Sequence, residues 1–207
     1  NGSEPWMLPD VHALEPTDAQ FAEHPNGPNG TFLPYTSDID TFARPWAVPG
    51  TAGLEHRIGG LEKEAITGNV SYDPANHQLM TDSRAWKVAN IVNDIPDLEV
   101  AGDEDAELLV LGCGSTFGSI RAAARRVRLA GGKVATLHLR HLNPMPQNLG
   151  EILHRYDKIL IPELNTGQLR KVIRAEFLVD AKSLTKVEGL PFTATEIEAA
   201  IEELFGA

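Results

Sequence analysis

Hydrophobic and polar positions follow a regular pattern only in the second half of the chain. The run ELLVLG at 107–112 is short and almost continuously apolar, as expected for a strand that is buried on both faces. Similar short runs at 133–139, 158–161 and 183–188 are separated by stretches with apolar residues at helical spacing. Residues 103–207 therefore predict β-α-β-α-β-α-β-α, an α/β fold with a parallel-rich open sheet and helices on both faces.

Local signals predict where the helices of this region begin and end. The first helix ends at Gly131-Gly132, and a short second helix is expected within 149–156. The third and fourth helices follow the later strands. The first, third and fourth helices each start at a residue whose side chain can accept a hydrogen bond from a backbone N–H. The expected caps are Ser115 or Thr116, then Thr166, and finally the capping box of Thr195 and Glu198.

The first 102 residues lack this regularity. Residues 1–31 are rich in Pro, Gly and acids, which predicts an extended segment, either a flexible linker or one that lies against another surface. Residues 32–102 predict an irregular connection and one helix, which begins at Thr81 or Asp82 and is stopped by Pro96. Irregular stretches of this length are usually functional or rest on a partner.

Charge and composition exclude several classes of protein. The 207 residues contain 18 Lys and Arg against 29 Asp and Glu, a net charge of −11, which argues against nucleic-acid binding. The single cysteine, Cys113, excludes an internal disulfide framework and any cysteine-held metal or iron–sulfur site. No apolar run is long enough to span a membrane and no leader is recognisable, so we expect a cytoplasmic protein without membrane contact. From the start at Asn1, without an initiator Met, we expect a fragment, a cleavage product or a chain cut from a longer subunit.

The glycine-rich turn at 112–118 lies between a predicted strand and a helix, where dinucleotide-binding folds hold phosphate. Phe117 occupies the third glycine position of that fingerprint, and the next strand ends in Leu139-Arg140-His141 instead of an acid. These departures disfavour NAD and favour a turn whose small residues permit close packing. A stand-alone NADP-binding Rossmann-like module remains an alternative.

Three residues in or after this turn carry side chains that could take part in catalysis or bind a metal. Cys113 lies beside a helix N-terminus, but a catalytic thiol needs a base nearby, and a structural thiol is favoured. His138 and His141 match the spacing of two metal ligands only loosely, and no third ligand suggests itself.

The irregular region places cationic side chains in rigid settings. Arg44 lies between Pro-containing segments and next to Trp46, whereas His56 and Arg57 follow a Pro-Gly turn. The planar guanidinium matches a carboxylate, so these residues are suited to a small dicarboxylate ligand. The alternative is that they pair with acids of the chain's own tail or of an interface.

Five distinctive segments add a family resemblance. They are ARPWAVPG at 43–50, GLEHRIGGLEK at 53–63, GNVSYDP at 68–74, LRHLNPMP at 139–146 and IPELNTGQL at 161–169. In this order they resemble the carboxyl-terminal part of the alpha subunit of 2-oxoglutarate:ferredoxin oxidoreductases (2-oxoglutarate synthases), in the 2-oxoacid:acceptor oxidoreductase family. The resemblance covers about residues 30–190. It implies that residues 103–207 form a transketolase C-terminal-like domain and that residues 32–102 include the end of the thiamine-pyrimidine-side domain.

The resemblance implies an enzyme that decarboxylates 2-oxoglutarate oxidatively with coenzyme A, giving succinyl-CoA and CO₂ and reducing ferredoxin, a reaction of the tricarboxylic acid cycle. It also implies thiamine diphosphate, Mg²⁺ and an iron–sulfur cluster in a hetero-oligomeric complex, none of them bound mainly by this chain. The partners would be the upstream part of the alpha subunit, a beta subunit and ferredoxin, and the isolated chain would be inactive. A non-catalytic docking subunit is the remaining alternative.

The resemblance also assigns substrate contacts, although it places no catalytic residue in this chain. Arg44 matches the arginine that the family uses to hold the 2-oxo acid, and Thr51 is a weaker match. Charge complementarity adds His56 and Arg57 as contacts to the distal carboxylate.

Overall fold

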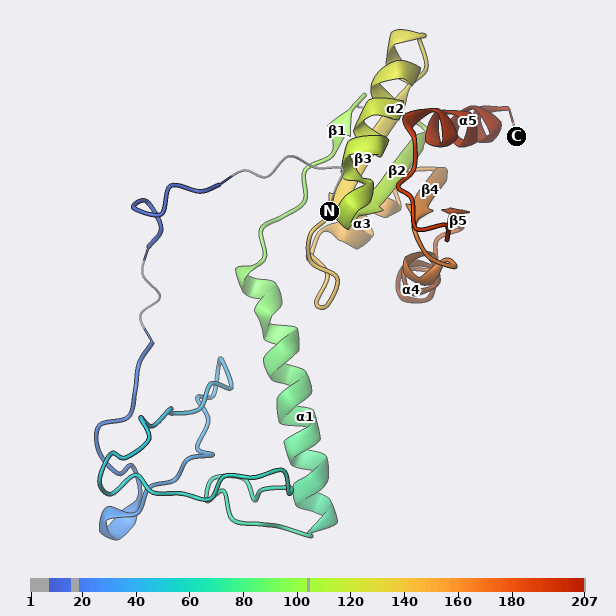
Figure 1. The fold of residues 1–207 in the computed structure, drawn as a ribbon. Coiled ribbons are helices and arrows are strands. Elements are labelled where there is room, and N and C mark those ends of the chain that lie inside the picture. The colour runs from blue at the N-terminus through green and yellow to red at the C-terminus, as the bar shows by residue number, and fades with distance from the viewer. Residues whose placement is uncertain (1–7, 16–18, 104, 207) are drawn as a thin grey trace. The chain divides into compact units, whose positions relative to one another are not determined.

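A computed structural model describes residues 8–15, 19–103 and 105–206, and the chain divides into two compact units (Figure 1). The smaller unit is Pro9–Asn93, and the larger is formed mainly by Asp94–Ala207. The boundary lies inside the segment 32–102 that the sequence sets apart as an irregular connection. No helix among the described residues is both long and apolar enough to cross a membrane.

The larger unit contains a five-stranded sheet in the order β1-β3-β2-β4-β5. The strands are β1 (Ala101–Gly102), β2 (Leu108–Cys113), β3 (Val134–Leu139), β4 (Lys158–Glu163) and β5 (Ala181–Thr185). The central β2 pairs in parallel with β3 and β4, and β5 is parallel to β4. The predicted parallel-rich α/β sheet is confirmed. The sequence missed β1, which is antiparallel to β3 and too short to show a hydrophobic period.

Helices cover both faces of this sheet, as predicted. They are α2 (Phe117–Leu129), α3 (Leu149–Leu153), α4 (Gln168–Phe177) and α5 (Ala194–Phe205), and a 3-10 turn, η3 (Gly114–Thr116), precedes α2. Successive side chains of a strand point to opposite faces. Leu108 and Val110 therefore pack in one core with residues of α2 and α5, whereas Leu109 and Leu111 pack in a second core with α3 and α4. These four side chains of β2 have no exposed surface.

The predicted cap of α4 is wrong. Gly167, not Thr166, stands at the N-cap position, with a positive φ of 86° and no side-chain cap. Two side chains outside the helix hold its first amides instead. The Asn165 carboxamide accepts from the amides of Gly167 and Gln168, both at 2.8 Å. The Glu163 carboxylate, only 3% exposed, accepts from the amides of Leu169 at 2.7 Å and Arg170 at 3.2 Å. A buried acid therefore satisfies the positive end of this helix.

The capping box of α5 also differs from the prediction. Thr193 and Glu196 form it, two residues earlier than the predicted Thr195 and Glu198, which have the same spacing. The predicted pair instead contacts the Arg126 guanidinium of α2, at 3.1 Å from the Thr195 hydroxyl and 3.3 Å from the Glu198 carboxylate. The sequence could not separate two equivalent pairs, because the choice is made by packing against α2.

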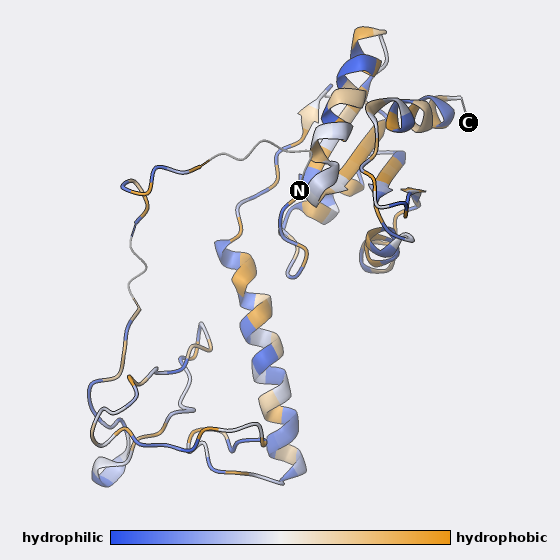
Figure 2. Cartoon of the chain, in the orientation of Figure 1, coloured by the Kyte–Doolittle hydropathy of each residue, from blue (hydrophilic) through white to orange (hydrophobic). Residues whose placement is uncertain are grey.

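The smaller unit consists of one long helix and irregular chain. Helix α1 (Pro74–Asn90) begins seven residues before the predicted start at Thr81, so that prediction is wrong. Asp73 caps it by accepting from the Ala75 amide at 2.9 Å, and Pro74 fits the first helical position, where no N–H is needed. The 3-10 turns η1 (Pro28–Gly30) and η2 (Ile91–Asp94) are the remaining helical pieces among the described residues. Figure 2 shows the contrast between the uniformly hydrophobic β2 and the mixed surface of α1, which buries only Met80.

Candidate functional site

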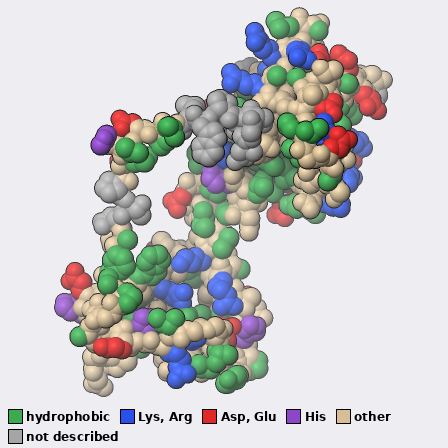
Figure 3. Space-filling view, viewed as in Figure 1, with side chains coloured by type: hydrophobic (Ala, Val, Ile, Leu, Met, Phe, Trp, Pro, Cys, Tyr) green, Lys and Arg blue, Asp and Glu red, His purple; other side chains and the backbone are tan. Residues whose placement is uncertain are grey.

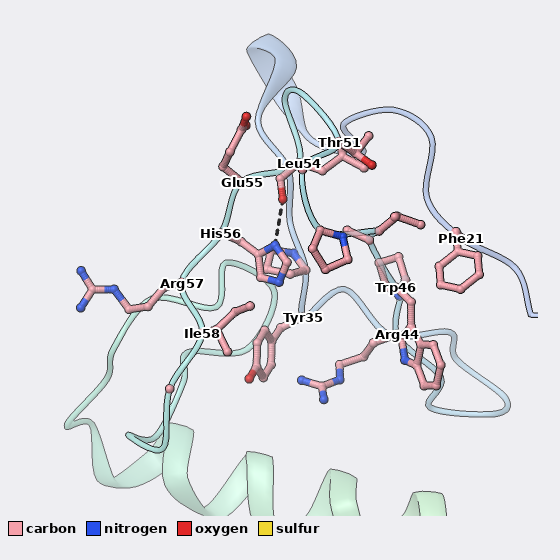
Figure 4. Close-up of a pocket in the computed structure, with 17 residues that line it drawn as sticks. Phe21, Tyr35, Arg44, Trp46, Thr51, Leu54, Glu55, His56, Arg57 and Ile58 are labelled. Carbon is pink, nitrogen blue, oxygen red and sulfur yellow. Dashed lines mark hydrogen bonds between the residues drawn. The ribbon is translucent and has the colours of Figure 1, made fainter.

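The four residues predicted to bind substrate come together in one cavity of the smaller unit. Arg44, Thr51, His56 and Arg57 all line this cavity, which has a volume of about 610 Å³ (Figure 4). Two consecutive turns bring their segments together, with the Thr51 amide donating to Val48 at 3.1 Å and the Leu54 amide donating to Thr51 at 3.2 Å. The cavity therefore depends on turn geometry and not on a helix or strand.

The imidazole of His56 is held on two sides. Its Nδ1 lies 2.8 Å from the Leu54 carbonyl oxygen, and its ring stands edge-on to Phe32 with centroids 5.3 Å apart. A carbonyl oxygen can only accept a hydrogen bond, so Nδ1 must be the donor. The Nε2 atom is then left to accept from a ligand when the ring is neutral, or to donate to one when the ring is protonated.

Arg44 is held by an aromatic ring. Its guanidinium carbon lies 4.1 Å from the centroid of Tyr35, a cation–π contact that leaves the edge of the fork available for hydrogen bonds. Figure 4 shows Arg44 beside Tyr35, whereas the Arg57 guanidinium points away from the other labelled side chains. No carboxylate among the described residues lies within ion-pair distance of either arginine. The contacts with Tyr35 and Phe32 were not predicted, because no periodic pattern in the irregular chain indicates which aromatic ring meets which side chain.

The glycine-rich turn at 112–118 is built for packing. A Cβ atom on Gly112 would lie 2.3 Å from Cδ1 of Ile120 and 2.9 Å from the hydroxyl of Thr116, so glycine lets β2 approach α2 closely. Thr116 is the N-cap residue, as one of the two predicted caps, but its hydroxyl donates to the Cys113 carbonyl at 2.9 Å and does not cap the helix. This geometry supports the packing interpretation of the turn.

The structure shows the surroundings of two other candidate residues of the larger unit, Cys113 and His138. Burial, and to a lesser extent the charge of Glu163, raises the pKa of the half-buried Cys113 thiol, which disfavours the nucleophilic thiolate. His138 packs edge-on against Phe117 with centroids 4.9 Å apart. Within the described ranges, no group of three or more His, Cys, Asp or Glu side chains could hold a metal ion.

Known proteins with similar sequences or folds point to one family. Residues 106–198 match the family model described as pyruvate:ferredoxin oxidoreductase core domain II. The chain is 54% identical over 198 residues to 2-oxoglutarate oxidoreductase subunit KorA of Mycobacterium tuberculosis, which covers 95% of this chain and 29% of that protein. It is 31% identical over 186 residues to 2-oxoacid:ferredoxin oxidoreductase 1, subunit alpha, of Aeropyrum pernix, covering 86% of this chain and 28% of that one.

A solved structure gives the same indication. The chain resembles 2-oxoglutarate:ferredoxin oxidoreductase from Magnetococcus marinus, a structure with 2-oxoglutarate, coenzyme A and succinyl-CoA bound, with a TM-score of 0.77 and 33% identity. The match covers 87% of this chain and 32% of that one. The chain thus spans about three-tenths of the length of the relatives it matches.

The sequence matches and the fold match agree on one class of protein, the alpha subunits of 2-oxoacid:ferredoxin oxidoreductases. The chain belongs to the 2-oxoacid:ferredoxin oxidoreductase family and corresponds to part of its alpha subunit.

Proposed function

We propose that this chain is part of the alpha subunit of a thiamine-diphosphate-dependent 2-oxoglutarate:ferredoxin oxidoreductase and supplies substrate contacts and assembly surface. The enzyme would convert 2-oxoglutarate and coenzyme A to succinyl-CoA and CO₂, passing two electrons to ferredoxin. One observation carries the proposal: in a chain 54% identical to a 2-oxoglutarate oxidoreductase subunit, the residues suited to a dicarboxylate line a single cavity.

The cavity offers different donors for the two carboxylates of 2-oxoglutarate. Arg44 presents a planar pair of N–H donors, and the Tyr35 ring fixes its guanidinium. His56 presents Nε2 toward the second carboxylate, because Nδ1 donates to Leu54, and Nε2 donates to that carboxylate in the protonated form of the ring. Each charge-assisted hydrogen bond contributes about 1.5–3 kcal/mol. In this proposal Thr51 adds a neutral hydroxyl donor, and Arg57 is a rim cation that attracts the dianion over a longer distance.

Thiamine diphosphate, when bound in the complex, supplies the carbanion-stabilising chemistry of decarboxylation. The proposal assigns this cofactor, its Mg²⁺ and the iron–sulfur cluster to the rest of a cytoplasmic complex, made of the upstream part of the alpha subunit and a beta subunit. This chain's own contribution is to bind and orient the 2-oxo acid through Arg44 and His56. Ferredoxin is the electron acceptor.

The proposal is tested in the purified complex by viologen reduction. With coenzyme A present, we expect turnover with 2-oxoglutarate and little turnover with pyruvate, which lacks the second carboxylate. Arg44→Ala should raise KM for 2-oxoglutarate about 10- to 100-fold, the equivalent of one charge-assisted contact. Arg125→Ala, which removes an exposed cation of α2, is the matched control and should leave KM unchanged. An unchanged KM in the Arg44 variant, or a preference for pyruvate, would contradict the proposal.

A further inference from the structure

A cavity of about 540 Å³ lies in the larger unit, beside the carboxyl end of β3. Its walls are the segment 96–101, one side of α2, and the last residues of β3 with the turn that follows them. Ligands of open α/β sheets bind beyond the carboxyl ends of strands, and the volume lies within the range of about 300–1,000 Å³ that is usual for small-molecule sites. We call it the β3 cavity.

One wall of the β3 cavity is basic. Helix α2 contains four arginines and no acid, and Figure 3 shows Lys and Arg side chains gathered over this helix, whereas Asp and Glu gather over α5. Arg121 lines the cavity from α2, and Arg140 lines it from the turn after β3. Neither lies within ion-pair distance of a carboxylate among the described residues. Arg128 also lines the cavity, but its guanidinium already donates to the carbonyls of Val134 at 2.7 Å and Ala101 at 3.0 Å.

A second wall of the cavity is acidic. Asp97 and Glu99 line it from the segment 96–101. The Asn148 side chain holds this segment, because it accepts from the Leu98 amide and donates to the Leu98 carbonyl, both at 3.0 Å. In the part of the chain that the structure describes, no cation lies within ion-pair distance of either acid. The backbone of the acidic wall is therefore fixed, and its two carboxylates have no counter-charge within the described ranges.

The two walls carry opposite charges that do not pair with each other. A dianion in this cavity would be repelled by Asp97 and Glu99, and a simple cation would be repelled by Arg121 and Arg140. A molecule that carries both charges satisfies both walls at once, with its anionic group on a guanidinium and its cationic group on a carboxylate. The charges of the cavity therefore favour a zwitterion.

The cavity also offers an apolar surface next to the basic wall. Phe117 and Arg121 are four residues apart in α2, so their side chains lie on the same face of the helix. The Phe117 ring is 40% exposed and stands edge-on to His138, with centroids 4.9 Å apart. Ile120 and Leu137 are buried beneath the cavity lining, with 4% and 3% exposed. An apolar group of a ligand would be removed from water here.

We propose that the β3 cavity binds a free α-amino acid with an apolar side chain. Its carboxylate would lie at Arg121, its ammonium at Glu99 and its side chain against Phe117. Arg140 and Asp97 add a second charge to each wall. This inference goes beyond the proposed function, because it involves neither the 2-oxo acid nor coenzyme A and does not depend on the role of Arg44.

Calorimetric titration of the purified complex tests the site with L-phenylalanine, L-leucine and glycine, and with two analogues of phenylalanine that each lack one charge. These are 3-phenylpropanoate, which has no ammonium, and phenethylamine, which has no carboxylate. L-phenylalanine and L-leucine should bind, and each analogue should bind about tenfold more weakly than phenylalanine because one charge-assisted contact is lost. Glycine, which lacks the side chain, should also bind more weakly.

Three results would overturn the proposal. If neither L-phenylalanine nor L-leucine binds at millimolar concentration, the cavity is not an amino-acid site. If 3-phenylpropanoate binds as tightly as phenylalanine, the site takes a simple anion, and if phenethylamine does so, it takes a simple cation.

Variants of the two walls locate the site through selectivity and not through loss of binding alone. Arg121→Gln should weaken binding of phenylalanine about tenfold and leave phenethylamine unaffected, because that amine has no carboxylate for the guanidinium. Glu99→Gln should weaken binding of phenylalanine and leave 3-phenylpropanoate unaffected. A variant that misfolds would weaken all three ligands together, so the selectivity separates a lost contact from a lost fold.

Two further variants are matched controls outside the lining of the cavity. Arg125→Gln removes an exposed cation of α2, and Glu107→Gln removes an exposed acid before β2, so both should leave every affinity unchanged. Size-exclusion chromatography checks that each variant complex is assembled. Equal affinity of wild type and Arg121→Gln for phenylalanine would place the amino acid elsewhere and overturn the proposal, while the effect of Arg44→Ala on KM for 2-oxoglutarate would stand or fall separately.

Discussion

The two units of this chain are ordered by different interactions. In the larger unit, apolar side chains from both faces of the sheet are removed from water, and β2 has Leu108, Leu109, Val110 and Leu111 fully buried. In the described part of the smaller unit, the buried apolar residues of the core are Phe32, Leu54 and Met80. The larger unit is therefore held together by burial of apolar side chains, whereas the cavity lined by Arg44 and His56 lies in the unit with few buried apolar residues.

Side-chain amides do much of the ordering in the smaller unit. Asn26 bonds to both backbone groups of Leu33, accepting from its amide at 2.7 Å and donating to its carbonyl at 3.1 Å. Asn76 of α1 bridges the loop in the same manner, accepting from the Ala65 amide and donating to the Lys63 carbonyl, both at 2.9 Å. These bonds replace the ladder of a sheet, and they leave the loops free to present Arg44, His56 and Lys63.

The largest effect should come from the core of the larger unit. Leu111→Ala removes a fully buried side chain between β2 and the helices α3 and α4, and the cavity left behind should lower the free energy of unfolding by about 2–5 kcal/mol. Leu129→Ala makes the same chemical change at a position that is 78% exposed, so its effect should stay within about 0.5 kcal/mol. Urea unfolding measures both. Equal losses would show that burial does not distinguish the two sites.

The next effect should appear in the smaller unit. Asn76→Ala leaves the Ala65 amide and the Lys63 carbonyl without their partner, which should weaken the loop by about 1–3 kcal/mol. Hydrogen exchange at the Ala65 amide should accelerate, while the amides of β2 stay protected. Asn69→Ala is the control, because the Asn69 side chain has no hydrogen bond within the described ranges. Faster exchange throughout β2 would mean that the two units unfold together.

This contrast also explains what the sequence could predict. The strands β2, β3 and β4 are visible because they are mostly buried and form apolar runs, as at 108–111, whereas β5 is buried only at Ala181. The predicted caps failed for two different reasons. At α5 two pairs with the same spacing were available and Thr193 forms the cap instead of Thr195. At α4 the N-cap is Gly167, and the first amides of the helix are held by Glu163 of β4, which no local pattern indicates. The start of α1 was missed although Asp73-Pro74 is a local start signal.

The residues of the candidate site likewise fall into those that the sequence predicts and those that only the fold brings together. Arg44 and His56 were predicted from their local setting and from resemblance, and the structure places both in one cavity. A second cavity of the smaller unit, of about 770 Å³, was not predicted, because Lys63 and Lys87 in its lining come from a loop and a helix that only the fold brings together. Residues that form a site across irregular chain leave no periodic signal.

The smallest effect concerns a surface cap of the well-packed unit. Hydrogen bonds from Lys186 and from the backbone and hydroxyl of Thr193 lower the pKa of Glu196 from 4.5 to about 2. A carboxyl group with a depressed pKa stabilises the folded state when ionised, so this contribution is complete above about pH 4.5 and disappears as the pH falls toward 2. Glu196→Gln should therefore shift the urea midpoint slightly downward at pH 7, and the difference from wild type should vanish as the pH approaches about 2.

Glu203→Gln, an exposed change on the same helix, should show no such pH dependence. A difference between wild type and Glu196→Gln that stays constant across the window would mean that the variant acts through helix propensity and not through the ionised capping box.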